Sequence, residues 1–140
     1  MSDRETVLFA NIAFYTAFAT RDVKAMEHLW AAGDVVCIHP GWPPLQGREA
    51  VLASWRSILA NPNAPNISCR GAIANVHGTT AVVTCMEMIA SQGEGTQVLA
   101  ATNVFIKPPG TKEWRMIHHH AGPAHIDPEK IEEEESQPMN

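Results

Sequence analysis

The second half of the chain consists of apolar segments separated by short turns, and this pattern restricts the fold more than any other feature. Glycine and proline residues, which favour turns, interrupt the segments. Connections this short join neighbouring strands that run in opposite directions. The sequence therefore predicts a meander of four antiparallel strands, at residues 67–76, 81–90, 96–106 and 114–120.

The first part of the chain carries the signals of three helices. Ser2 begins a capping-box pattern, Ser-Asp-Arg-Glu, and the helix after it is predicted to end near residue 19 or 20. Asp22 is the expected N-cap of a second helix, and Gly47 opens a third, which Pro62 ends. A short buried strand is predicted at residues 35–38. Three helices before a meander predict an α+β fold, in which the helices cover one face of a curved antiparallel sheet.

Length and charge predict one folded unit with an acidic end. A chain of 140 residues is long enough for one domain and too short for two. Of its 15 acidic and 10 basic residues, six acids and one base lie in residues 127–140, so residues 1–126 carry nine of each. We therefore expect a single domain at residues 1–126 and a mobile tail at residues 127–140. The absence of a basic stripe argues against nucleic-acid binding.

Other motifs restrict location and cofactors. The three cysteines, Cys37, Cys69 and Cys85, are widely spaced in apolar segments, which predicts free thiols in a reducing compartment. Because we find neither a long apolar run nor a leader, we expect a cytoplasmic protein that does not enter a membrane. No glycine-rich loop follows a strand and opens a helix, so no nucleotide cofactor is expected.

Several predicted strands are apolar on both faces, as Ala81-Val82-Val83 illustrates. One face is expected to meet the helices and an internal pocket. The other face would expose a broad apolar surface unless another subunit covered it. We therefore predict a homodimer through this face of the sheet.

The first candidate site residue is His39, in the loop after the short strand. Pro40 restricts the backbone before it and thereby orients the imidazole. An imidazole titrates near neutral pH and can act as a general base, so His39 is a candidate proton acceptor. The alternative is a histidine bonded to nearby backbone at the pocket edge. Trp42 in the same loop is either a cover over a planar ligand or a packing residue.

The last predicted strand ends in three consecutive histidines. Strand alternation sends His119 to one face and sends His118 and His120 to the other, toward a partner subunit or a neighbouring strand. Two imidazoles on one face suit zinc, but no further ligands stand at a recognisable spacing, so no metal site is predicted. Asn103, in an apolar strand, either contacts a ligand or is a buried amide bonded to backbone.

Some positions are assigned a structural role alone. We expect four aromatic residues to lie in the core and two acidic residues, Glu87 and Glu94, to be solvated. The expected core aromatics are Phe9, Phe18, Trp30 and Trp55.

Three segments, in this order and spacing, resemble the nuclear transport factor 2-like superfamily, and more narrowly its SnoaL-like branch. They are RDVKAMEHLWA, HPGWPPLQGREAV and TNVFIKPPGTKEWRMIHHHAG, and the resemblance extends over about residues 4–122. The third segment is similar to the end of the calcium/calmodulin-dependent kinase II association domain. The resemblance implies a cone-shaped barrel in which a bent sheet wraps three helices and encloses a pocket.

The resemblance also suggests a site, by comparison with ketosteroid isomerase. The position of that enzyme's base corresponds to His39, and the position of its donor aspartate corresponds to Asn103. Its donor tyrosine corresponds to Phe14, and Tyr15 is rotated about 100° around the helix from that position. His119 would share the pocket face with Ile117.

The function implied is a SnoaL-like pocket protein that binds a small apolar carbonyl-bearing ligand. If it is an enzyme, it would catalyse isomerisation, dehydration or cyclisation by general acid/base chemistry. The alternative is a non-catalytic ligand-binding or oligomerisation module. The catalytic candidates are His39, Asn103 and His119, and the ligand-binding candidates are Trp42, Phe14, Tyr15 and Ile117.

Overall fold

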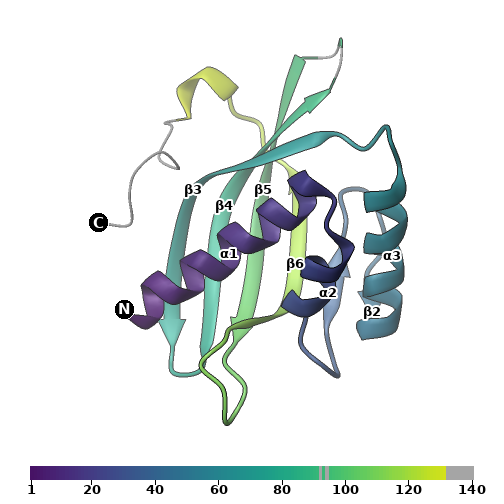
Figure 1. Ribbon diagram of the computed structural model, residues 1–140. Coiled ribbons are helices and arrows are strands. Elements are labelled where there is room, and N and C mark those ends of the chain that lie inside the picture. Colours follow the sequence, from purple (N-terminus) through teal and green to yellow (C-terminus); the bar gives the residue numbers. More distant parts are fainter. Residues whose placement is uncertain (92, 94, 132–140) are drawn as a thin grey trace.

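A computed structural model describes residues 1–91, 93 and 95–131 of the chain. The protein has three helices beside one six-stranded sheet (Figure 1), which confirms the predicted α+β class. The helices are α1 (Asp3–Thr20), α2 (Val23–Leu29) and α3 (Arg48–Ala60). The strands are β1 (Val36–Ile38), β2 (Leu45–Gln46), β3 (Asn66–His77), β4 (Thr80–Ser91), β5 (Gly95–Ile106) and β6 (Arg115–Pro123), followed by the 3-10 helix η1 (Pro128–Lys130).

The helix boundaries follow from local capping, as predicted. Ser2 Oγ accepts from the backbone N–H of Glu5 at 3.1 Å, and Glu5 Oε1 accepts from the backbone N–H of Ser2 at 2.9 Å, which completes the capping box. α1 ends at Thr20, where Arg21 adopts the left-handed conformation with φ of 55°. Asp22 then caps α2 by accepting from the backbone N–H of Ala25 at 3.0 Å.

The sheet has the order β2-β1-β6-β5-β4-β3. β3 to β6 form the predicted antiparallel meander, but the sheet is not antiparallel throughout, because β1 runs parallel to β6. β2, which was not predicted, pairs with β1 in the antiparallel sense. The short β1 carries no local signal that it will run parallel to β6, because β1 and β6 are distant in sequence.

The helices lie on one face of the sheet, and the core fills the space between them. Figure 1 shows α1 crossing β3, β4 and β5, with α2 beside β6 and α3 beside β2. Trp30 and Trp55 are buried as predicted, and Phe18 packs partly buried against the core. Phe9 is exposed on α1, which corrects the expectation that it is a core residue. All three cysteines are free thiols, as predicted.

The chain after β6 turns back toward the sheet. Residues 128–130, near the start of the expected acidic tail, form η1 close to β5. The rest of that tail, at residues 132–140, and Glu94 lie outside the described residues. Within the described part of the chain, none of the helices combines the length and hydropathy needed to cross a membrane.

We predict that Asp22→Ala destabilises the protein by about 1 kcal/mol, because the first turn of the short helix α2 loses its side-chain acceptor. The free energy of unfolding from denaturant titration measures the loss. Asp22→Asn, which keeps a capping oxygen, is the matched control and should retain most of the stability. Equal losses in the two variants would contradict a capping role.

Candidate functional site

A tight turn after β1 determines the position of His39. Pro40 and Gly41 occupy the two central positions, Gly41 has φ of 82°, and the Trp42 N–H donates to the His39 carbonyl at 2.9 Å. Glycine suits this positive φ, as in a type II turn. The turn places the Trp42 ring edge-to-face with the imidazole, at a centroid distance of 4.9 Å. Trp42 is 46% exposed and His39 only 4%, so the indole stands between the imidazole and solvent.

The hydrogen bonds of His39 define which nitrogen carries its proton. Ser54 Oγ donates its single hydrogen to the Val51 carbonyl at 2.7 Å. The contact of 2.9 Å between Ser54 Oγ and His39 Nε2 is therefore a bond in which Nε2 donates. In the neutral ring Nδ1 then carries the lone pair. The atom of His39 that can accept a proton is thus Nδ1.

The parallel pairing of β1 with β6 brings the two candidate histidines into one region. Cys37 is opposite His119 in the register, and His39 follows two residues later. The Trp55 ring lies near both, with centroid distances of 4.8 Å to His39 and 6.0 Å to His119. Phe14 contacts both His119, at 5.0 Å, and Trp55, at 5.4 Å. The structure therefore gathers His39, His119 and Phe14 around a tryptophan that was predicted to be core alone.

His119 and three other side chains form a ring of polar contacts. The other three are Tyr15, Glu87 and Asn103. The Tyr15 hydroxyl donates to Glu87 Oε2 at 2.6 Å and accepts from Asn103 Nδ2 at 3.1 Å. Asn103 Nδ2 also donates to Asn11 Oδ1 at 2.8 Å, so Asn103 Oδ1 is an acceptor, and His119 Nδ1 donates to it at 2.6 Å. His119 Nε2 closes the ring at 3.9 Å from Glu87 Oε2. Neutral His119 therefore presents a lone pair to the carboxyl group.

Two of these contacts correct sequence-based expectations. Glu87 is 3% exposed, whereas it was expected to be solvated. Tyr15 is rotated from Phe14 around α1, yet its hydroxyl reaches Asn103, so a hydroxyl donor is present in the interior after all. One signal could have identified Glu87: it is an acidic residue in an apolar segment and shares its strand face with Cys85 and Ile89.

Burial shifts the pKa of each interior group in the direction that favours its neutral form. Burial raises the pKa of Glu87 to about 7, although the Tyr15 hydroxyl opposes the shift. Burial lowers the pKa of His39 to about 4. Burial, followed by the charge of His39, lowers the pKa of His119 to about 3. Burial and the nearby Glu87 raise the pKa of Tyr15 well above its ordinary value. Near pH 7 the interior thus holds two neutral bases and a carboxyl group that is only partly ionised.

The other candidates on β6 lie at or beyond a register shift. Ile117 falls at the shift between the β5–β6 pairs and packs partly buried against the core. His118 is half-buried, His120 is exposed, and their rings lie 6.4 Å apart. Among residues 1–91, 93 and 95–131 there is no group of three or more potential metal ligands.

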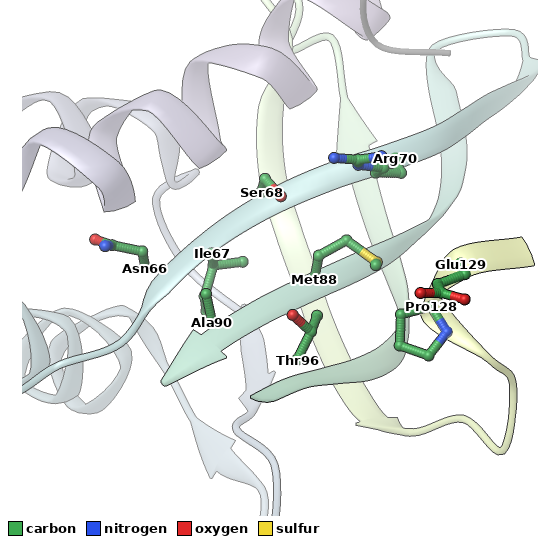
Figure 2. Close-up of a pocket in the computed structure, with 9 residues that line it drawn as sticks. All are labelled: Asn66, Ile67, Ser68, Arg70, Met88, Ala90, Thr96, Pro128 and Glu129. Atoms are coloured by element: carbon green, nitrogen blue, oxygen red, sulfur yellow. The ribbon is translucent and has the colours of Figure 1, made fainter. Parts of the chain in front are cut away.

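Two surface hollows lie on the opposite side of the sheet. Ser68 and Arg70 alternate with Cys69, which contacts Asn11 on α1, so they face away from the helices. They line a hollow of about 360 Å³ between β3, β4, β5 and η1 (Figure 2). A neighbouring hollow of about 420 Å³ shares Thr96 and Pro128 with it. Neither hollow is lined by a predicted site residue.

A curved sheet with three helices on one face and acid/base side chains between them is the arrangement that the sequence resemblance implied. Comparison with known proteins identifies the family. A model of the SnoaL-like domain matches residues 7–125, and the chain belongs to this family.

Two solved structures and one curated protein are similar to this chain. A candidate dehydratase of the NTF2-like family from Streptomyces avermitilis is 39% identical, with a TM-score of 0.78 over 89% of this chain and 97% of its own. A candidate calcium/calmodulin-dependent protein kinase type II association domain from Thiobacillus denitrificans is 32% identical, with a TM-score of 0.74 over 85% and 95%. The F-box protein SKIP8 of Arabidopsis thaliana is 26% identical over 126 residues, which are 89% of this chain and 52% of that protein. The chain spans about half the length of this curated relative.

We predict that Glu87→Gln changes how stability depends on pH. With a folded-state pKa of about 7 against an ordinary 4.5, Glu87 contributes stability that is complete below pH 4.5 and is lost as pH rises through 7. Glutamine still accepts from Tyr15 and has no charge to bury. The unfolding free energy of Glu87→Gln should therefore rise relative to the unsubstituted protein by about 2–3 kcal/mol between pH 4.5 and 8.

Denaturant titrations at a series of pH values measure this difference. The protein also loses stability below pH 6.5, the ordinary pKa of histidine, because the pKa values of His39 and His119 are lowered in the folded state. Both histidines are present in both proteins, so the difference between the two unfolding free energies isolates Glu87. Glu49→Gln makes the same change at an exposed position and serves as the control. A difference between Glu87→Gln and the unsubstituted protein that stays constant with pH would contradict the prediction.

Proposed function

We propose that this protein binds a small apolar carbonyl-bearing compound beside His39 and His119 and moves a proton next to its carbonyl group. The observation that carries the proposal is the pair of buried neutral imidazoles that both lie near the Trp55 ring, with His39 Nδ1 available as a base. The apolar rings of Phe14, Trp42 and Trp55 suit an apolar ligand. Free thiols support a reducing location such as the cytoplasm.

In the proposed chemistry, His39 Nδ1 removes a proton from the carbon next to the carbonyl group. The electron pair of that C–H bond passes into the carbonyl system, and a donor stabilises the charge that develops on the oxygen. His119 and Asn103 are the candidates for this role. The single N–H of neutral His119 is already donated to Asn103 Oδ1. Both hydrogens of Asn103 Nδ2 are donated too, to Asn11 and Tyr15. A ligand oxygen must therefore replace one of these acceptors.

Among isomerisation, cyclisation and dehydration, dehydration receives the most support. Dehydration of a β-hydroxy carbonyl compound needs a base for the C–H proton and an acid for the departing hydroxyl group, which leaves as water. Glu87, whose pKa is raised to about 7, stays partly protonated near neutral pH and lies in the same interior as the base. The similarity to a candidate dehydratase points in the same direction.

We predict that the protein accelerates exchange of the α-hydrogens of cyclohexanone for deuterium in D₂O and that His39→Gln removes about 10²–10⁴-fold of the acceleration. Proton NMR follows the loss of the α-hydrogen signal. Since the pKa of His39 is lowered to about 4, the rate should be level from pH 8 to 5 and fall below about pH 4.

The control is His77→Gln, which removes an exposed imidazole at the end of β3. Its rate should match that of the unsubstituted protein, which excludes non-specific catalysis by surface histidines. Unchanged exchange in a folded His39→Gln variant would reject His39 as the base.

A second candidate function, a non-catalytic assembly module, is favoured by the outer face of the sheet. Ile73 is 60% exposed there, since the adjacent Ala74 faces the core. Strand alternation places partly exposed apolar residues of β4 and β5 on the same face, among them Val82 and Val104, which are paired in the register. An association domain is among the similar structures. We propose that a second copy of the chain covers this face, with or without catalysis inside.

We predict that Ile73→Lys shifts the protein from dimer to monomer, because a lysine ammonium in an apolar interface costs more free energy than exposure of one isoleucine. Light scattering coupled to size-exclusion chromatography measures the mass. Ile12→Lys, at an exposed apolar position on α1, is the matched control and should stay dimeric. If the Ile73→Lys variant remained dimeric, the interface could not be the face of the sheet that carries Ile73.

A further inference from the structure

Two tryptophans have a buried indole N–H without a hydrogen-bond acceptor among the described residues. These are Trp30 and Trp55, each 2% exposed. Trp114 provides the contrast, since its indole N–H donates to Thr6 Oγ1 at 2.9 Å. Buried donors in proteins are almost always paired, so each unpaired N–H requires an explanation.

The surroundings of Trp55 differ from those of Trp30. Four rings contact the Trp55 indole and determine its orientation: Phe14 and Phe18 at 5.4 Å, His39 at 4.8 Å and His119 at 6.0 Å. Trp30 instead lies at the end of α2, in an isolated bridge with Met116. The unpaired N–H of Trp55 thus belongs to the candidate site, and that of Trp30 does not.

The Trp55 indole and the His39 imidazole both lie beside the Cys37 thiol. Burial raises the pKa of this thiol to about 12, and hydrogen bonding from the Trp55 side chain opposes the rise. The N–H does not reach full hydrogen-bond geometry with the sulfur, which is a weak acceptor. His39 Nδ1 lies 3.9 Å and Nε2 lies 3.7 Å from the same sulfur. A hydrogen-bond donor without a strong acceptor and the candidate base therefore border the same thiol.

We propose that the Trp55 indole N–H is the donor that binds the ligand's oxygen, so that the site selects compounds with a carbonyl group next to the carbon that His39 deprotonates. The inference rests on the proposed function and deepens it by naming the group that holds the oxygen. A carbonyl oxygen gives the buried N–H the acceptor it otherwise lacks. A hydrocarbon of the same shape leaves the N–H unpaired, so the site discriminates against it.

The test uses two probes of nearly equal shape, cyclohexanone and methylenecyclohexane, in which a CH₂ group replaces the oxygen. In protein labelled with ¹⁵N-tryptophan, NMR resolves the indole N–H signals of the four tryptophans. Cyclohexanone should shift the Trp55 signal downfield in a saturable way, and methylenecyclohexane should not. The Trp30 signal, from an equally buried and unpaired N–H, is the internal control and should stay in place.

Substitution gives a second, independent measurement. Trp55→Phe keeps an aromatic ring and removes the N–H, so it should bind cyclohexanone about two- to tenfold more weakly and bind methylenecyclohexane equally well. Trp30→Phe is the matched control and should bind both probes as the unsubstituted protein does. If Trp55→Phe fails to fold, the shift experiment on the unsubstituted protein decides the question by itself.

The outcomes separate this inference from the proposed function. If the ketone shifts the ring signals of His39 but not the Trp55 N–H, or if neither ligand binds, the assignment of Trp55 is overturned. Equal shifts with both probes would overturn it as well. If the Trp55 N–H responds to the ketone alone while no α-hydrogen exchange occurs, the oxygen site stands and the proposed proton transfer fails.

Discussion

The three-residue parallel pairing between β1 and β6 is the constraint on which the rest of the interior depends. It places Cys37 opposite His119, and the turn at Pro40-Gly41 then carries His39 to the same region. α3 follows immediately and supplies Ser54 and Trp55, the polar and the aromatic partner of His39. Because β1 is short, it is held largely by its neighbours in the sheet. Without this pairing, the two histidines would sit on separate parts of the fold.

Around this framework, the interior polar groups form hydrogen bonds with one another. Glu87, Tyr15, Asn103 and His119 close a ring, and within the described residues no lysine or arginine forms an ion pair with the buried carboxyl group. Because burying a charge there would cost several kcal/mol, burial shifts the acid toward its protonated form and keeps the imidazoles uncharged. A ring of this kind specifies its own geometry, because the loss of one member leaves its neighbours unpaired.

Sequence patterns were sufficient for the elements and insufficient for the contacts between them. Ser2, Asp22 and Gly47 begin the three helices as predicted, because capping depends on residues a few positions apart. The family resemblance drew attention to His39, Phe14, Asn103 and His119, which the structure gathers in one region together with Trp55. Glu87 was assigned to solvent, because its charge was given more weight than the apolar residues that share its strand face. The contacts of the Tyr15 hydroxyl with Asn103 and Glu87 could not be predicted, because they join segments that are distant in the sequence.

The sequence by itself determined the class of the fold, the helix starts and the four-stranded meander. These features rest on local spacing, which is written directly in the chain. Only the tertiary structure decided that β1 runs parallel to β6, that Glu87 faces Tyr15 and that the Trp55 N–H is left without an acceptor. Each of these depends on segments that are distant in the sequence and meet only after the sheet curves around the helices. Their burial, and with it the direction of every pKa shift in the site, is a property of that assembled interior.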